Sequence, residues 1–262
     1  MNMPDPHNSK PMNFRRRGIY LLPNLLTTAA LFAGFYAIVQ SMNDKFEYAA
    51  VAIFIAMVFD GLDGRVARMT HTQSEFGAEY DSLSDMVSFG VAPALLMYEW
   101  AFRDLGKLGW FAAFIYCAGT ALRLARFNAN IDVVDKRYFQ GLPSPAAAAL
   151  VAGFVWVMQD NQFTGHELRW PAVAITVFAG LSMVSNVKFY SFKDFNMRKS
   201  VPFIVILIMA LFFMVISSYP PGVLFLLFLC YSLSGYVWWL FGLRKKTEPS
   251  KEALSKEESP KA

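Results

Sequence analysis

Charged residues are scarce in this sequence, and their scarcity excludes an ordinary soluble domain. Asp, Glu, Lys and Arg make up 17% of the 262 residues, whereas hydrophobic residues make up 55% and the mean hydropathy is +0.34. About a quarter of the residues in a typical soluble protein are charged. Long apolar runs recur along nearly the whole chain, and this pattern predicts an integral membrane protein.

Cysteine and histidine are also rare. The two cysteines, Cys117 and Cys230, lie within apolar runs, which indicates buried small side chains rather than a disulfide or a zinc site. His7 and His166 lie in polar segments without a partner, and His71 is expected to be a solvated loop residue. The sequence therefore offers no cysteine or histidine placed to form a covalent intermediate.

The apolar runs predict an all-α protein with about eight transmembrane helices. They cover residues 18–41, 47–68, 82–102, 109–128, 144–160, 170–189, 201–217 and 222–243. The run after Arg15, Arg16 and Arg17 is too long for the core of a signal peptide and lacks a cleavage site, so no cleavable signal is expected. Residues 1–17 are predicted to be a cytoplasmic segment, and residues 244–262 a disordered cytoplasmic tail.

The distribution of basic residues predicts the orientation. If the N-terminus is cytoplasmic, only Lys45, Arg103, Lys107 and Arg169 of the 24 Lys and Arg residues lie on the outer side. This asymmetry follows the positive-inside rule, and it accounts for the net charge of +4 without a nucleic-acid partner. Basic residues at the inner face also favour anionic lipid headgroups.

Three predicted helices place charges at one depth. Asp60 follows Glu47, Asp85 precedes Glu99, and Arg123 follows Gly109 by nearly the same number of residues. Each charge is therefore roughly 20 Å along its helix from the outer side, at a rise of about 1.5 Å per residue. Charges at such a depth are costly unless they face a polar cavity or one another, so this coincidence predicts a site.

Four aspartates dominate the predicted site. Asp60 and Asp63 share one helical face, and Asp81 and Asp85 share another. Four facing carboxylates repel one another, and hard divalent cations with oxygen ligands are their natural partners. Two such cations suit displacement at phosphorus, because they stabilise both the attacking and the leaving oxygen. Gly64 and Gly77 permit close approach of the backbone, and Arg68 can grip a phosphate.

The full spacing, Asp60-x2-Asp63-Gly64-x2-Ala67-Arg68-x8-Gly77-x3-Asp81-x3-Asp85, resembles the signature of the CDP-alcohol phosphotransferases. Members of this family move a CDP-activated lipid phosphate onto an alcohol and release CMP. The resemblance implies a six-helix core over residues 18–200, with residues 201–243 adding two further helices. It also implies two divalent cations, Mg or Mn with Ca possible, and a homodimer in the membrane (the cytoplasmic membrane if the source is bacterial).

The resemblance implies roles for individual residues. Asp60, Asp63, Asp81 and Asp85 would bind metal, and Asp85 would also accept the proton of the incoming alcohol. The residues implied to contact the CDP group are Asn24, Thr27, Gly64, Arg68, Ser74 and Gly77. Two of these have a purely structural alternative. Ser74 fits a helix N-cap equally well, and Asn24 can hydrogen-bond within its own helix.

Three further segments resemble the phosphatidylserine synthase branch of the family. They are "LRLARFNAN", "FQGLPSPAAAA" and "SNVKFYSFKD". This likeness implies CDP-diacylglycerol and L-serine as substrates, with Arg123 and Arg126 holding the serine carboxylate. Alternatively, both arginines merely end their span as positive-inside residues, which suits Arg126 better than the deeper Arg123. The loop Ala129–Gln140 is expected to be either a gate or an ordinary solvated loop.

Other functions remain open from the sequence. Within the family, phosphatidylglycerophosphate synthase is the main alternative, followed by transferases with other alcohols. A cation transporter would spread its carboxylates across the membrane and break its helices, whereas these aspartates cluster near one face. A lipid-binding protein without catalysis would be expected to have lost an aspartate of the motif, and none is missing.

Overall fold

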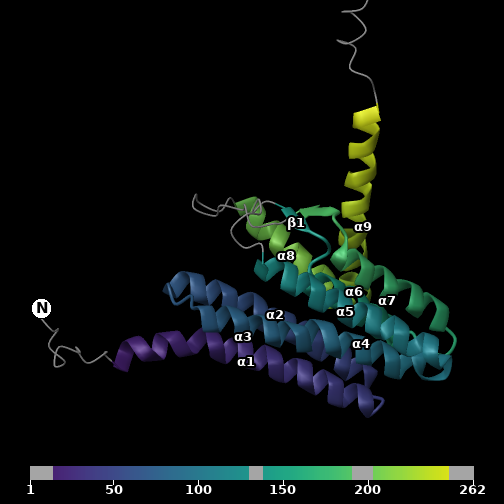
Figure 1. Cartoon of the computed structure of the whole chain (residues 1–262), viewed down its shortest axis with the longest axis horizontal. Helices are drawn as coiled ribbons and strands as arrows, with labels where there is room; N and C mark the ends of the chain where they lie inside the picture. The colour runs from purple at the N-terminus through teal and green to yellow at the C-terminus, as the bar shows by residue number, and fades with distance from the viewer. Residues whose placement is uncertain (1–13, 130–137, 191–202, 248–262) are drawn as a thin grey trace, which may run out of the picture.

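A computed structural model describes residues 14–129, 138–190 and 203–247, and these residues are almost entirely helical (Figure 1). The predictions for residues 1–13, for most of the loop Ala129–Gln140 and for residues 248–262 lie outside the described residues. In chain order the helices are α1 (Phe14–Met42), α2 (Phe46–Thr70), α3 (Glu75–Asp85), α4 (Ala92–Met97), α5 (Lys107–Ala129), α6 (Ser144–Asp160), α7 (Arg169–Val184), α8 (Phe203–Ser218) and α9 (Pro220–Thr247).

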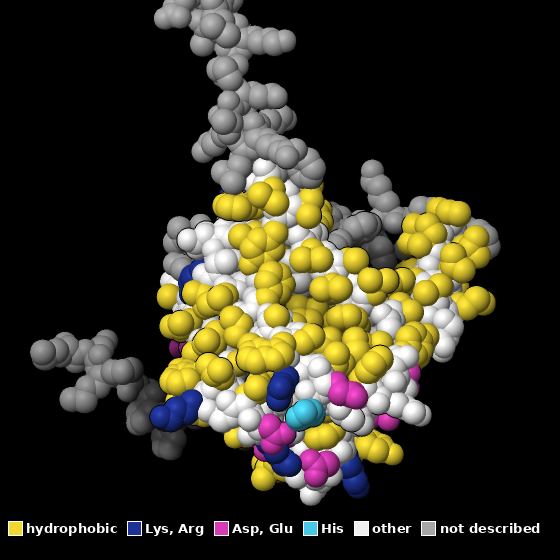
Figure 2. Space-filling model, turned by 90° about the vertical axis from the view of Figure 1, so that its right-hand side faces the viewer, with side chains coloured by type: hydrophobic (Ala, Val, Ile, Leu, Met, Phe, Trp, Pro, Cys, Tyr) yellow, Lys and Arg dark blue, Asp and Glu magenta, His cyan; other side chains and the backbone are white. Residues whose placement is uncertain are grey.

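Three of the described helices are long and apolar enough to cross a membrane. These segments are Leu21–Met42, Lys107–Ala129 and Pro220–Leu240, and Arg169–Val184 and Leu207–Ser218 are shorter apolar helices. Hydrophobic side chains cover a broad face of the molecule, with charged side chains collected along one edge (Figure 2). The prediction of an all-α integral membrane protein is confirmed, while the count of eight spans stays a prediction.

The helices pack closely because small residues line their contacts. Helix α1 runs beside α2, and Ala33 and Ala37 are buried with Ala52 and Ala56 of α2 (Figure 1). Helices α5 and α7 meet at Gly119 and Gly180, where a Cβ atom on Gly180 would come within 2.9 Å of the Cα atom of Tyr116. Small residues at such contacts are typical of membrane helices, where close packing replaces the hydrophobic effect between helices.

The third predicted span is not a single α-helix. Helix α3 is followed by a π-helical segment η1 (Met86–Val91), by α4, by a second π-helical segment η2 (Tyr98–Phe102), and by the short 3-10 helix η3 (Arg103–Leu105). Pro93 lacks the N–H group that would bond the carbonyl oxygen of Phe89 in a regular helix. The Tyr116 hydroxyl donates to this oxygen instead, at 2.9 Å. The helix also begins at Glu75, earlier than the predicted residue 82. Its first turns are polar, so they did not belong to the apolar run from which the span was predicted.

The sequence did not predict the two short strands, which lie between α5 and α6 and after α7 along the chain. Strand β1 (Tyr138–Gln140) pairs antiparallel with β2 (Lys188–Tyr190), with Phe139 opposite Phe189. The apolar run predicted over 170–189 is therefore a helix only to Val184, and its last residues turn into β2. The pairing ties the start of α6 to the end of α7, close to the arginines of α5.

Candidate active site

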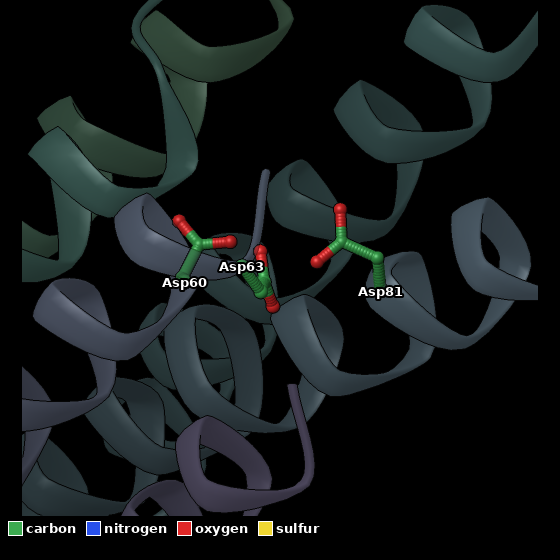
Figure 3. A group of neighbouring side chains, drawn as sticks. All are labelled: Asp60, Asp63 and Asp81. Carbon is green, nitrogen blue, oxygen red and sulfur yellow. The ribbon is translucent and has the colours of Figure 1, made fainter. Parts of the chain in front are cut away.

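Three aspartates from two helices converge on one point. Asp60 and Asp63 lie one turn apart on α2, and Asp81 lies on the neighbouring α3 (Figure 3). One carboxylate oxygen from each residue lies within 4.8 Å of the others. No described histidine or cysteine belongs to this group. Asp63 is buried, and the other two are partly buried. The predicted convergence of these three carboxylates is confirmed.

Asp85 joins the group through Asp60. It lies one turn beyond Asp81 on α3, and its carboxyl group lies beside that of Asp60. Asp85 thus adds a fourth carboxyl group to the cluster between α2 and α3.

Neighbouring groups satisfy only part of the carboxylate cluster. The Thr27 hydroxyl of α1 donates to Oδ2 of Asp63 at 2.6 Å. In contrast, Oδ1 of Asp81 is buried and accepts no hydrogen bond from the described residues. A buried oxygen without a donor is costly unless a cation compensates it. The set of carboxylate oxygens therefore fits hard divalent cations such as Mg²⁺ and Mn²⁺.

Three residues predicted to contact the CDP group, Asn24, Ser74 and Gly77, lie beside one another at the start of α3. The Ser74 hydroxyl accepts a hydrogen bond from the Gly77 N–H at 3.0 Å, so Ser74 is an N-cap of α3. Asn24 of α1 lies beside Gly77, with its Oδ1 atom 3.6 Å from the position that a Cβ atom on Gly77 would take. The structural alternative for Ser74 is thus confirmed, while its contact with CDP stays a prediction.

The end of α2 carries the other two predicted CDP contacts. A Cβ atom on Gly64 would lie 3.5 Å from Nη1 of Arg68, which is ordinary contact, so packing does not require glycine here. Arg68 is exposed in the last turn and lies within electrostatic range of Asp63. His71 caps this helix in a left-handed conformation, as befits a solvated loop residue.

Arg123 brings a positive charge to the aspartates. It lies on α5 and interacts electrostatically with Asp60 and Asp85, in agreement with the expectation that these charges face one another. Its Nη1 atom donates to the hydroxyl of Ser144, the first residue of α6, at 2.6 Å. The sequence did not single out Ser144, although its position at the start of a helix after Pro143 was a usable signal.

Arg126 has a different set of partners. Its two terminal nitrogens donate to the backbone carbonyl oxygens of Gln140, Met183, Val184 and Ser185, at 2.8–3.3 Å, and to the side chain of Asn186. These oxygens include the last carbonyls of α7, which have no partner within the helix. Arg126 thus ties α5 to the end of α7. Its role in acceptor binding stays a prediction that this geometry does not favour.

The turn before α6 explains the motif Gly141-Leu142-Pro143-Ser144-Pro145. Gly141 has a φ of +79°, and a Cβ atom there would come within 2.9 Å of Nη2 of Arg126. Its N–H donates to the carbonyl of Val187, and the N–H of Leu142 donates to that of Ser182. The turn therefore fixes the start of α6, and with it the hydroxyl of Ser144 that receives Arg123.

An apolar groove of about 760 Å³ opens between α1 and α2. Thr28 and Phe59 line one end of the groove. They are the sequence neighbours of Thr27 and Asp60, so this end lies at the level of the aspartates. From there it continues along both helices to Tyr36 and Tyr48. The site thus combines a carboxylate cluster with an adjoining surface suited to hydrocarbon.

The fold and the site define a membrane protein with a cation-binding carboxylate cluster between its helices. The family model for CDP-alcohol phosphatidyltransferases matches residues 20–184. A CDP-diacylglycerol–serine O-phosphatidyltransferase of Helicobacter pylori is 35% identical over 225 residues, which cover 85% of this chain and 92% of that protein. Proteins with the same description from Methanocaldococcus jannaschii and Saccharomyces cerevisiae are 42% and 40% identical, over 52% and 50% of this chain and 61% and 51% of their own.

The chain therefore belongs to the CDP-alcohol phosphatidyltransferase family. The matched segment contains all four aspartates and both arginines. This membership confirms the resemblance drawn from the aspartate motif, and it argues against the cation-transporter alternative.

Proposed function

We propose that this protein transfers the phosphatidyl group of CDP-diacylglycerol to L-serine and releases CMP. The observation that carries the choice of serine is the similarity to the Helicobacter pylori enzyme along nearly its whole length. The carboxylate cluster and the apolar groove beside it agree with a substrate that has a diphosphate and acyl chains. No feature of the described residues favours glycerol phosphate, the acceptor in the main alternative.

The proposed roles follow the position of each side chain. Asp60, Asp63, Asp81 and Asp85 hold two divalent cations, with Mg²⁺ or Mn²⁺ as the proposed ions. When bound, such cations neutralise the diphosphate and stabilise the attacking and leaving oxygens. The proposed contacts with the CDP group are Asn24, Thr27, Gly64, Arg68, Ser74 and Gly77. Thr27 acts mainly through Asp63, to which it donates its proton.

The reaction proceeds by direct displacement at phosphorus. Asp85 accepts the proton of the serine hydroxyl. The serine oxygen forms a bond to the phosphorus that carries diacylglycerol, and the bond from this phosphorus to the oxygen of CMP breaks. Arg68 lies at the exposed end of α2, where it offsets charge on the departing CMP. Arg123 binds the serine carboxylate.

One assay tests the proposal. Purified protein is supplied with CDP-diacylglycerol, a divalent cation and, in turn, L-serine, glycerol 3-phosphate and inositol, and CMP release is measured. We expect release with serine and little with the other alcohols. Preferential use of glycerol 3-phosphate would show that the protein is a phosphatidylglycerophosphate synthase instead.

We also propose that the site faces the cytoplasm, on the ground that the basic residues gather on that side in the sequence. Thr72 lies in the turn between α2 and α3. A cysteine at Gln73, next to it, in a background without Cys117 and Cys230, should react with an impermeant maleimide only after the inner face is opened. Labelling in intact cells would reverse the orientation. The homodimer implied by the family stays a prediction, to be tested by crosslinking in the membrane.

A further inference from the structure

Two buried serines bond the backbone of α1 from the segment that packs beside it, helix α3 and its continuation η1 (Figure 1). The Ser84 hydroxyl of α3 donates to the carbonyl oxygen of Thr27 at 3.2 Å. Four residues further on, in η1, the Ser88 hydroxyl donates to the carbonyl oxygen of Ala30 at 3.1 Å. The contacts advance in the same direction along both segments, so α1 runs parallel to α3 and η1.

The two segments approach each other closely enough to fix this alignment. A Cβ atom on Gly34 of α1 would lie only 2.5 Å from the Oγ atom of Ser88, so the close approach requires glycine there. Both serines and the α1 residues that they bond are buried. A buried hydroxyl that lost its acceptor would be costly, so each of these bonds favours the observed register over any other.

Thr27 connects this contact to the carboxylate cluster. Its backbone carbonyl accepts from Ser84 of α3, while its side-chain hydroxyl donates to Oδ2 of Asp63 on α2 at 2.6 Å. The carbonyl oxygen of Pro23 is a second acceptor near this hydroxyl, but it lies farther away, at 3.1 Å. Because bonds to carboxylates are the shorter and stronger ones, the proton is directed to Asp63. One residue of α1 thus bonds both helices that carry the aspartates.

Ser84 lies on α3 three residues after Asp81 and directly before Asp85. The path from Asp63 through Thr27 to Ser84 therefore links the carboxylates of α2 to those of α3. Groups that hydrogen-bond metal ligands orient them and strengthen metal binding. We infer that Ser84 is a positioning residue of the cation site, which acts through Thr27 to set the spacing between the two pairs of carboxylates. This inference rests on the cation site of the proposed function, and it gives Thr27 a part in cation binding beside its proposed contact with CDP.

Binding of Mn²⁺ to the purified protein without substrate tests this role, with Ser88→Ala as the matched control. Paramagnetic resonance of free Mn²⁺ gives the dissociation constant, and thermal unfolding without cations gives the stability. We expect Ser84→Ala to weaken Mn²⁺ binding about 2- to 10-fold, the range for one neutral hydrogen bond. Ser88→Ala loses a similar bond to α1, but the side chain of Ala30 has no group that could bond a carboxylate. It should therefore lower the stability and leave Mn²⁺ binding unchanged.

A second variant cuts the same path at Thr27. Thr27→Val keeps the carbonyl that accepts from Ser84 but loses the hydroxyl that donates to Asp63. We expect it to weaken Mn²⁺ binding about 10- to 100-fold, the cost of losing a group that hydrogen-bonds a metal ligand. In this background Ser84→Ala should add little, because its connection to Asp63 is already broken. Thr27→Ser, which keeps the hydroxyl, should bind Mn²⁺ nearly as the wild type does.

Other outcomes would overturn the inference. Unchanged Mn²⁺ binding by Ser84→Ala would remove Ser84 from the cation site, and an equal loss in Ser88→Ala would mean that both serines act on packing alone. A loss that persists in full in the Thr27→Val background would show that Ser84 does not act through Thr27. The wild-type protein tests the proposed function separately. If it bound no Mn²⁺, the cation site itself would be wrong, whereas use of another alcohol would leave these binding measurements equally decisive.

Discussion

The two halves of the site satisfy their charges in opposite ways. On α2 and α3, four carboxyl groups lie close together, and one buried oxygen of Asp81 has no donor among the described residues. On α5, both arginines donate to neutral oxygens of the protein. Arg126 binds four backbone carbonyls, whereas Arg123 donates to the Ser144 hydroxyl and also lies within electrostatic range of Asp60 and Asp85.

This difference separates the carboxylates, which need an ion, from Arg126, whose partners all lie within the folded chain. The carboxylates oppose one another until cations bind, so their energetic balance depends on the ligand. Arg126 stabilises the fold even without substrate, because it binds carbonyl groups that would otherwise lack partners. Removing a charge should therefore have different consequences for stability on the two sides.

The largest expected effect follows replacement of a carboxylate. Asp81→Asn should lower the turnover number more than about 100-fold. Loss of a residue that only hydrogen-bonds to a metal ligand typically costs 10- to 100-fold in activity, and loss of the ligand itself should cost more. Without divalent cations its thermal stability should not fall, since one of the mutually repelling charges is gone. CMP release and thermal unfolding in detergent measure the two effects.

Asp160→Asn is the matched control, because Asp160 is an exposed carboxylate at the end of α6. It should leave turnover and stability unchanged. A chelator should inactivate the wild type reversibly, and a divalent cation should stabilise the wild type more than Asp81→Asn. Near-wild-type turnover by Asp81→Asn would contradict the cation site.

The next effect concerns Arg123, the α5 arginine that interacts electrostatically with Asp60 and Asp85. Arg123→Lys keeps the charge but loses the planar fork that binds a carboxylate. We expect the KM for serine to rise by the equivalent of about 1.5–3 kcal/mol, the range for hydrogen bonds to charged groups. The KM for CDP-diacylglycerol should change much less. Equal changes in the two constants would place Arg123 outside the acceptor site.

Arg126 should give the opposite pattern. Arg126→Ala leaves the last carbonyls of α7 and that of Gln140 without their donor, so we expect a loss of unfolding free energy of about 1–3 kcal/mol. Thermal unfolding should show the loss, and Arg126→Lys should recover part of it. The KM for serine of Arg126→Lys should stay close to that of the wild type. A selective rise in this constant would restore the predicted role in acceptor binding.

Local spacing explains why the sequence predicted the carboxylate half well. Asp60 and Asp63 must share a face of one helix, and so must Asp81 and Asp85, while a short turn makes the two helices neighbours. The apolar runs predicted the helices for a similar reason, because hydrocarbon thickness sets their length. In the third span, one continuous helix was predicted; Pro93 was an unused signal of a break, and the Tyr116 hydroxyl that compensates it lies on another helix.

The arginine half was harder to predict because its contacts join distant segments. Arg126 meets carbonyls near residues 140 and 184. Neither strand of the β1–β2 pair exceeds three residues. The alternation of apolar and polar residues that marks a strand cannot be recognised over so few positions. The donation of Thr27 to Asp63 likewise depends on the packing of α1 against α2.

The smallest effect distinguishes two roles of Ser74, which lies at the edge of the carboxylate half. Its oxygen accepts from the Gly77 N–H, and its own proton can still be donated to a phosphate. Ser74→Ala removes both interactions, and loss of the cap should cost about 1 kcal/mol of stability. Ser74→Asn retains an oxygen that caps α3 well but lacks the hydroxyl. We therefore expect Ser74→Asn to restore the stability without restoring the KM for CDP-diacylglycerol, which both variants should raise a few-fold. If Ser74→Asn instead matched the wild type in thermal unfolding and in this KM, Ser74 would be a cap alone, and the carboxylate half would hold its nucleotide without it.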